Sequence, residues 1–178
     1  MSKHVLILDD DVHIIEILRD SLTSREYACV SVQTAAEALV HLGEKSFDVL
    51  IADVVLGESS GIEVAREAKT LQPEIVIVIL TGALDIESAI EAIRIGADDY
   101  ILKPFRMTEI PIAVERGLEK RELIRTVRRH ERDLEQRVSE ATQELQDSHL
   151  RLIETEQYLN NILNSTVDAI ITINNDDL

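Results

Sequence analysis

Short apolar runs that do not alternate with polar residues constrain the fold of this chain more than any other sequence feature. Three of them, at 4–8, 47–52 and 75–80, consist largely of Val, Ile and Leu. A strand exposed on one face alternates apolar and polar residues, whereas a strand covered on both faces does not. With two further runs at 28–32 and 99–102, the pattern predicts a five-stranded parallel sheet flanked by helices on both sides.

Segments with apolar residues three and four positions apart separate these runs, as in amphipathic helices. Four such sets occur: Ile14, Ile15 and Leu18; Ala35, Ala38, Leu39 and Leu42; Ile62, Ala65, Ala68 and Leu71; Ile86, Ala89, Ile90 and Ile93. Thr34, Gly43 and Gly96 stand where helix caps belong. Alternating strands and helices indicate a doubly wound α/β domain, which binds its ligands at the carboxyl ends of its strands.

Polar residues directly follow four of the predicted strands, at the ends where ligands bind. They are Asp9 and Asp10 after the first strand, Asp53 after the third, Thr81 after the fourth and Lys103 after the fifth. Clustered carboxylates repel one another unless a cation holds them, and a site made of oxygen ligands suits Mg²⁺. A lysine and a hydroxyl add donors for further negative charge. This set of groups is what phosphoryl transfer to a carboxylate requires.

The motifs around these residues resemble those of the response-regulator receiver domains of two-component systems. They are LILDD at 6–10, DVLIADVVLGESSG at 48–61, ILTG at 79–82 and GADDYILKPF at 96–105. The resemblance implies that 1–120 is a receiver domain with a flavodoxin-like sheet of order 2-1-3-4-5. It also implies slow self-catalysed phosphotransfer and dephosphorylation, with a histidine kinase or a phosphotransfer protein as phosphodonor.

The resemblance implies a role for each residue of the acidic group. Asp53 is the residue that accepts the phosphoryl group. Asp10 and Asp53 bind Mg²⁺ directly, and Asp9 acts on the ion through bound water. The backbone carbonyl of Val55 is the third protein ligand.

The resemblance also implies which residues respond to the phosphoryl group. Thr81 and Lys103 contact its oxygens, and Tyr100 is the aromatic switch residue that turns inward. Family members usually have proline where Gly57 stands, so a more flexible loop is expected after the phosphoacceptor. The bond between Lys103 and Pro104 is often cis in the family, which the sequence alone does not decide.

Charge and composition exclude other classes of function. The net charge of −16 and the pI near 4.6 repel a nucleic-acid backbone, so no direct binding of nucleic acid is expected. The single cysteine, Cys29, has no partner for an intrachain disulfide and lies in an apolar stretch, so a buried small hydrophobe is expected. No apolar run reaches the roughly 18 residues of a membrane helix, and the expected location is the cytoplasm.

A long helix is predicted after the receiver domain, because only Pro111 and Gly117 interrupt the sequence between 108 and 165. A heptad repeat places Ile124, Glu131, Val138, Leu145, Leu152 and Leu159 at position a, and Val127, Leu134, Ala141, Ser148, Thr155 and Ile162 at position d. A parallel homodimeric coiled coil through residues 124–162 would cover this stripe. An intramolecular antiparallel hairpin is the alternative, although neither Gly nor Pro marks a turn.

Two segments of the C-terminal part resemble pieces of larger signalling proteins. HERDLEQRVSEATQEL, within 121–164, resembles the signalling helices that join sensory and output modules. LNNILNSTVDAIITINNDDL resembles the entry to a PAS domain, which implies a break near Ser165, a strand at 169–173 and the beginning of a PAS domain at 165–178. The output enzyme, which could be a histidine kinase, is then expected outside this chain.

Two other functions are compatible with parts of the sequence. Asp9 and Asp11 could form the D-x-D motif of haloacid-dehalogenase phosphatases, but Val12 and His13 stand where that family has Gly-Thr. A purely structural dimerisation module is the second alternative. Retention of the complete set of polar residues at the strand ends argues against it.

Overall fold

The computed structural model describes residues 2–57, 59–82, 90–91 and 93–175, with side chains described as far as residue 163. The chain divides into two compact units, Met1–Arg125 and Thr126–Leu178. One helix, α5 (Glu109–Asn175), contributes residues to both. None of the helices in the described ranges combines the length and apolarity that crossing a bilayer requires.

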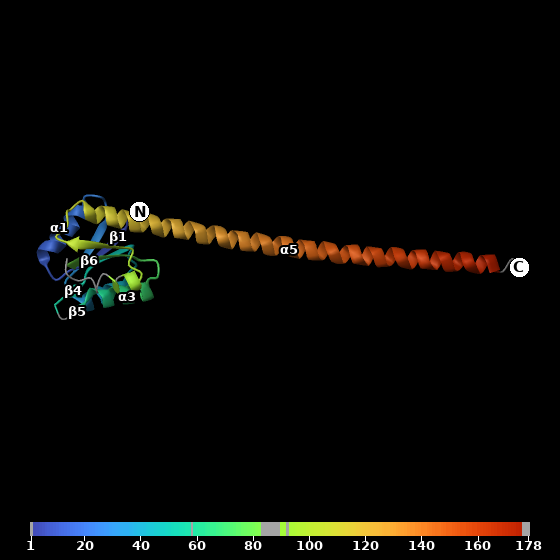
Figure 1. Ribbon diagram of the computed structural model, residues 1–178, viewed down its shortest axis with the longest axis horizontal. Helices are drawn as coiled ribbons and strands as arrows, with labels where there is room; N and C mark the ends of the chain where they lie inside the picture. Colours follow the sequence, from blue (N-terminus) through green and yellow to red (C-terminus); the bar gives the residue numbers. More distant parts are fainter. Residues whose placement is uncertain (1, 58, 83–89, 92, 176–178) are drawn as a thin grey trace. The chain divides into compact units, whose positions relative to one another are not determined.

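A five-stranded parallel sheet forms the centre of the first unit (Figure 1). Its strands are β1 (His4–Leu8), β2 (Ala28–Val32), β3 (Val49–Asp53), β6 (Val76–Gly82) and β7 (Asp99–Lys103). Their spatial order is β2-β1-β3-β6-β7, which is the predicted order 2-1-3-4-5 once the two short strands between β3 and β6 are set aside. The three apolar runs that do not alternate are the three inner strands, as their sequence predicted.

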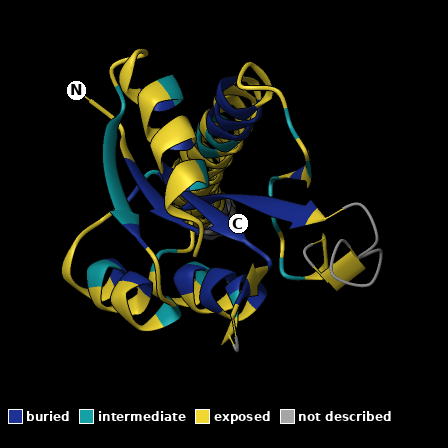
Figure 2. Cartoon of the chain, turned by 90° about the vertical axis from the view of Figure 1, so that its left-hand side faces the viewer, coloured by how far each residue is buried: buried dark blue, intermediate teal, exposed yellow. Residues whose placement is uncertain are grey.

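Helices cover both faces of the sheet (Figure 2). Side chains alternate across each strand, so β3 sends Leu50 and Ala52 to one face and Val49 and Ile51 to the other. On the first face they pack with α2 (Ala35–Glu44) and α3 (Gly61–Leu71). On the second face they pack with α1 (Val12–Thr23) and the first turns of α5.

Two of the three predicted helix caps are found in the structure, and the third is not. Thr34 caps α2 as expected, since its side chain accepts a hydrogen bond from the Glu37 backbone N–H. The prediction that Gly43 is a cap was wrong, because α2 continues through it and ends when Lys45 adopts an extended backbone. Gly96 does have the left-handed conformation expected of it, with φ 80°.

The fourth predicted helix is only partly described. Ile86 and Ala89, which helped to define it, lie outside the described residues. Ile90 and Ile93 are helical and exposed. Cys29 on the edge strand β2 is half-buried rather than fully buried, and burial raises the pKa of its thiol.

The C-terminal segment differs from its prediction. The helix α5 continues to Asn175, so the predicted break near Ser165 and the predicted strand at 169–173 are wrong. No glycine or proline follows Gly117 in the sequence, and the apolar residues of this segment fit a helical spacing as well as a strand. A strand also needs a neighbour for its backbone groups, and no strand among the described residues pairs with this segment.

Candidate functional site

The predicted site residues meet at the carboxyl edge of the sheet because parallel strands end on the same side. Asp9 directly follows β1, and Asp53 is the last residue of β3. Asp53 pairs with Leu80, the residue before Thr81 in β6. Lys103 ends β7 and pairs with Gly82, the residue after Thr81. The pairing of neighbouring strands therefore brings residues from four separate parts of the sequence to one edge.

Three carboxylates form the acidic part of this site. One oxygen from each of Asp9, Asp10 and Asp53 lies within 4.8 Å of the other two. Asp9 is completely buried and Asp53 nearly so, whereas Asp10 is exposed. Hard oxygen donors in such a group fit Mg²⁺, and an exposed member leaves a way in from solvent. These carboxylates could hold a divalent cation.

Lys103 links two of the carboxylates. Its Nζ donates hydrogen bonds to Oδ2 of Asp9 and to Oδ2 of Asp53, each at 2.8 Å. Its side chain is only 24% exposed, so solvent screens these ion pairs less than it would on the open surface. The peptide bond from Lys103 to Pro104 is cis.

The environment changes the pKa of two members of this cluster. Burial raises the pKa of Asp9, and the hydrogen bonds from Lys103 and from the Asp11 backbone N–H lower it by less. Burial alone would lower the pKa of Lys103, but its hydrogen bonds to Asp53 and Asp9, together with their charges, raise it. The lysine therefore stays protonated while it contacts the two carboxylates.

Thr81 and Tyr100 lie on neighbouring strands but in different environments. Thr81 is completely buried, and its hydroxyl donates a long hydrogen bond of 3.4 Å to the Gly82 carbonyl. Tyr100 is 48% exposed, so in this structure its ring is neither turned inward nor packed as a core residue. Its backbone pairs with Ile79, two residues before Thr81.

A small hairpin follows the phosphoacceptor candidate, and sequence reasoning did not predict it. It consists of β4 (Val55–Leu56) and β5 (Ser59–Ser60), which pair antiparallel. Gly57 has φ 59°, a left-handed conformation that proline cannot adopt because its ring holds φ near −65°. Glycine at this position instead of the usual proline therefore allows a paired loop. The sequence signal that could have predicted this hairpin is Gly57 itself, because glycine is typical of the first central position of a two-residue turn.

Gly61 is a second site residue that sequence reasoning missed. A Cβ atom at this position would lie 1.8 Å from the backbone oxygen of Asp53. The Gly61 backbone N–H donates to the Val54 carbonyl at 3.0 Å, which holds the start of α3 against the end of β3. Only glycine allows this close approach, because it lacks a side chain.

Asp11 does not join the carboxylate cluster. It is the N-cap of α1, and its side chain accepts a hydrogen bond of 2.8 Å from the His13 backbone N–H. A D-x-D motif would need this side chain free to act with Asp9. The geometry therefore argues against the phosphatase alternative.

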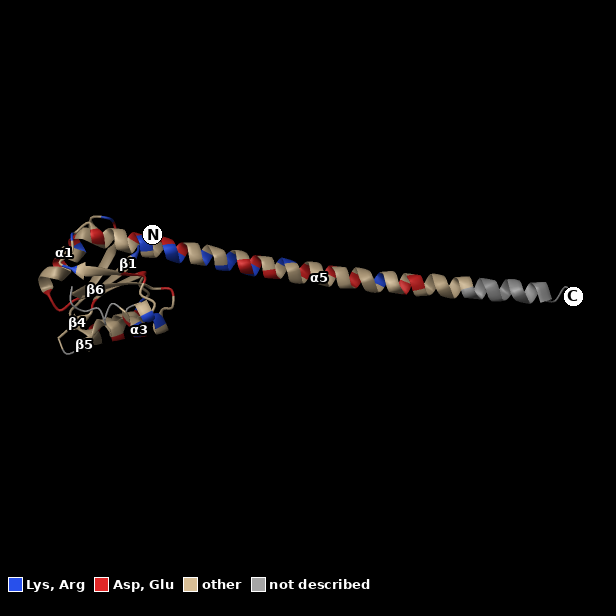
Figure 3. Cartoon of the chain, in the orientation of Figure 1, with Lys and Arg blue, Asp and Glu red and all other residues tan. Residues whose placement is uncertain are grey.

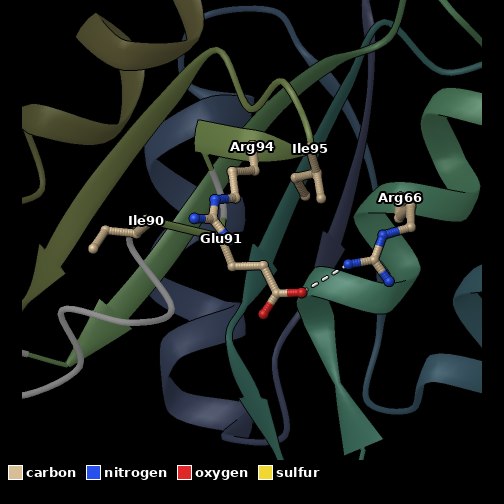
Figure 4. A pocket seen from close by; sticks show the side chains of 5 residues that line it. All are labelled: Arg66, Ile90, Glu91, Arg94 and Ile95. Atoms are coloured by element: carbon tan, nitrogen blue, oxygen red, sulfur yellow. Dashed lines mark hydrogen bonds and ion pairs between the residues drawn. The ribbon is translucent and has the colours of Figure 1, made fainter.

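A second hollow lies away from the strand ends (Figure 4). Its lining includes Arg66 from α3 and residues 90, 91, 94 and 95. Arg66 donates to Glu91 at 2.7 Å, and both side chains are about half exposed. None of the predicted site residues is among the described residues that line it.

The family model of the response regulator receiver domain matches residues 5–115. The transcriptional regulatory protein ZraR of Salmonella typhimurium strain LT2 is 35% identical over 114 residues, which are 64% of this chain and 26% of that protein. The DNA-binding transcriptional regulator NtrC of Escherichia coli K12 is 32% identical over 114 residues, which are 64% of this chain and 24% of that protein. The chain thus spans about a quarter of the length of these curated relatives.

Solved structures show the same likeness over the part of the chain that carries the site. A response regulator receiver domain protein from Clostridium thermocellum has a TM-score of 0.64 and 28% identity, over 68% of this chain and 98% of that one. NtrX from Brucella abortus has a TM-score of 0.67 and 30% identity, over 71% of this chain and 29% of that one.

Proposed function

Because the chain belongs to the response regulator receiver domain family, we propose that Asp53 is its phosphoacceptor. Receiver domains take phosphoryl groups from histidine kinases, and a phosphohistidine of such a kinase or of a phosphotransfer protein is the proposed donor. One observation carries the proposal. Lys103 Nζ lies 2.8 Å from Asp53 Oδ2, at the edge where Asp9 and Asp10 supply further oxygen ligands.

The proposed reaction moves a phosphoryl group from nitrogen to oxygen. A carboxylate oxygen of Asp53 attacks the phosphorus, the bond from phosphorus to the imidazole nitrogen breaks, and the imidazole leaves with the electron pair. Asp53 then carries an acyl phosphate. Lys103 is positioned to place its ammonium beside the phosphoryl oxygens, and the hydroxyl of Thr81 would donate to one of them. Attack by water on the same phosphorus returns the free carboxylate.

We propose that Mg²⁺ binds through Asp10, Asp53 and the Val55 carbonyl, with Asp9 acting through water. When bound, the ion neutralises the carboxylates and the phosphoryl oxygens. The backbone of the hairpin supports the role of Val55. The preceding carbonyl, of Val54, already accepts from Gly61, and carbonyls alternate in direction along a strand, so that of Val55 is directed away from Gly61.

Phosphorylation is proposed to act through Thr81 and Tyr100. The weak bond from the Thr81 hydroxyl to the Gly82 carbonyl is easily exchanged for one to a phosphoryl oxygen. Tyr100, which is outward here, would then turn inward beside it. The face next to the first turns of α5 would change shape as a result.

The remaining proposals concern the rest of the chain. We propose a receiver domain at 1–120, a signalling helix at 121–164 that forms a parallel homodimer through 124–162, and an output module that begins at 165–178. A PAS domain is proposed there, and the proposal rests on the sequence resemblance alone. The helical backbone of 169–173 does not support it. We expect a cytoplasmic protein that does not bind nucleic acid directly, because its net charge is −16.

Labelling of the intact chain tests the phosphoacceptor. Acetyl phosphate or a phosphohistidine donor should label one residue when Mg²⁺ is present and none in EDTA, and mass spectrometry should place the label on Asp53. Asp53→Asn should abolish labelling. Asp11→Asn is the matched control, because it removes a neighbouring carboxylate while asparagine still caps α1. A label on another residue, or equal labelling in EDTA, would contradict the proposal.

A further inference from the structure

The second unit presents an exposed apolar stripe along α5. Its side chains at positions a and d are exposed, including Leu134, Val138, Leu145, Leu152 and Leu159, which are 54–72% exposed. Burial of such side chains against another surface removes apolar area from water and stabilises the assembly. The charged residues beside the stripe indicate what that surface is.

We propose that a second copy of this chain covers the stripe in parallel and in register, and that ion pairs between the two helices fix the register. The inference rests on the parallel homodimer of the proposed function and adds the contacts that fix its register. In a parallel coiled coil, a residue at position g lies beside the residue five positions later, at e, in the partner helix. From position 130 onward, the pairs this creates are His130 with Glu135, Arg137 with Thr142, Glu144 with His149, Arg151 with Glu156, and Tyr158 with Leu163. The first pair, Leu123 with Arg128, joins an apolar residue to a charged one.

Four of the five pairs from position 130 onward join complementary side chains. Arg151 with Glu156 joins opposite charges, and both histidines face a glutamate to which an imidazole N–H can donate. Tyr158 and Leu163 form an apolar pair at the end of the series. None of the pairs joins like charges, and each occurs twice in a symmetric dimer. Positively and negatively charged residues alternate with uncharged ones along this part of α5 (Figure 3).

The contacts within one helix leave these charges available. In the described residues 126–163, none of the side chains in the three pairs that contain a glutamate forms an ion pair with its own helix: His130, Glu135, Glu144, His149, Arg151 and Glu156. Arg137 differs, since it pairs with Asp133 of its own helix at 3.1 Å. Its counterpart across the dimer is the uncharged Thr142, whose hydroxyl donates to the Val138 carbonyl at 2.7 Å. Arg137, whose counterpart across the dimer is uncharged, is thus already paired within its own helix.

An antiparallel arrangement with full overlap fits the charges less well. It would place g residues of the two helices opposite each other, so that Arg137 faces Arg151 and Glu144 faces its own copy. Like charges at such positions destabilise a helix pair. The charge pattern therefore favours the parallel arrangement over its antiparallel rival.

Charge reversal in the full chain tests the register. Arg151→Glu and Glu156→Arg should each weaken the homodimer by about tenfold, because each turns two attractive pairs into two repulsive ones. An equimolar mixture of the two variants should form a heterodimer as tight as the original, measured by sedimentation equilibrium. Arg129→Glu and Glu154→Arg, at outward positions f and c, are matched controls and should leave association unchanged.

Cysteine cross-linking tests the direction. In a Cys29→Ser background, Leu159→Cys should give a disulfide-linked dimer, because identical a residues face each other in a parallel register. Full antiparallel overlap would hold the two introduced cysteines on the order of 50 Å apart. A monomeric chain at tens of micromolar, absence of the cross-link, or a mixture no tighter than the single variants would overturn the inference. Labelling of Asp53, measured on the same variants, reports separately on the phosphoacceptor.

Discussion

Gly61 sets the position of the Asp53 backbone, because only a residue without a side chain fits against that carbonyl. A Cβ atom would lie 1.8 Å from the Asp53 oxygen, and the obstructing atom is backbone, which cannot rotate away. Gly43 offers a contrast within the same domain, because it lies inside α2 with nothing within 4 Å of the Cβ it lacks. A side chain would therefore clash with backbone at position 61 and would meet no obstacle at position 43.

Alanine at the two positions should have opposite effects. Gly61→Ala should lower the free energy of unfolding by about 1–3 kcal/mol and slow the labelling of Asp53, since the start of α3 must move away from β3. Gly43→Ala should raise the free energy of unfolding by about 0.5–1 kcal/mol, because alanine favours a helix interior. Urea denaturation of both variants checks this prediction. Equal changes in the free energy of unfolding would show that Gly61 is not needed for the close approach of α3 to the Asp53 backbone.

At the scale of single elements, the hairpin of β4 and β5 depends on the left-handed conformation of Gly57. Gly57→Pro should disrupt the pairing of Leu56 with Ser59, because proline cannot reach φ 59°. We expect a loss of about 1–3 kcal/mol in stability and a changed affinity for Mg²⁺. Gly57→Asn is the control, since asparagine tolerates this conformation and should change both quantities less. Equal stability and equal Mg²⁺ affinity of the two variants would show that the hairpin does not depend on the left-handed conformation of Gly57.

The first turns of α5 are anchored to the opposite edge of the sheet. Arg121 donates to Oδ1 of Asp48 at 2.8 Å and to its backbone carbonyl at 3.2 Å. Arg125 forms an ion pair with Glu74 nearby. Burial alone would raise the pKa of Asp48, but the hydrogen bonds from Arg121 and from the His4 backbone N–H lower it below its usual value.

This anchor should make stability depend on pH. Because the pKa of Asp48 is lower in the folded chain than in the unfolded chain, its contribution is complete above the unfolded value of about 3.9 and is lost as pH falls through the folded value. Asp48→Asn should therefore destabilise the chain at pH 7, and the difference from the original should shrink toward pH 3. Denaturant titrations at a series of pH values check this, and a constant difference would exclude an ionic anchor.

Sequence periodicity predicted the large elements and missed the small ones for identifiable reasons. The inner strands β1, β3 and β6 were recognisable because burial on both faces leaves an apolar run. Asp9, Asp53, Thr81 and Lys103 were recognisable because each ends such a run. The hairpin after Asp53 was not, since two-residue strands have no periodicity. The segment at 169–173 was misassigned because a short apolar run fits a helix and a strand equally.

At the scale of the whole molecule, α5 is the only element of the described residues that belongs to both units, so we expect the state of Asp53 to reach the C-terminal part through it. Cross-linking of cysteines introduced at positions a and d should differ between chains with and without the phosphoryl mimic beryllofluoride. We expect the polar residues of the proposed seam, Glu131, Ser148 and Thr155, to keep alternative packings close in energy. An unchanged pattern in fully modified chains would mean that the signal leaves by another surface.

The lysine that links Asp9 to Asp53 has a consequence for the order of events at the site. With all groups ionised, the three carboxylates and the ammonium leave two net negative charges, which a divalent cation cancels. The proposed phosphorylation would convert a monoanion at Asp53 into a dianion, so the site with both cation and phosphoryl group would still be less negative than the site with neither. Departure of the cation first would expose three uncompensated charges. The cation should therefore arrive before the phosphoryl group and leave after it.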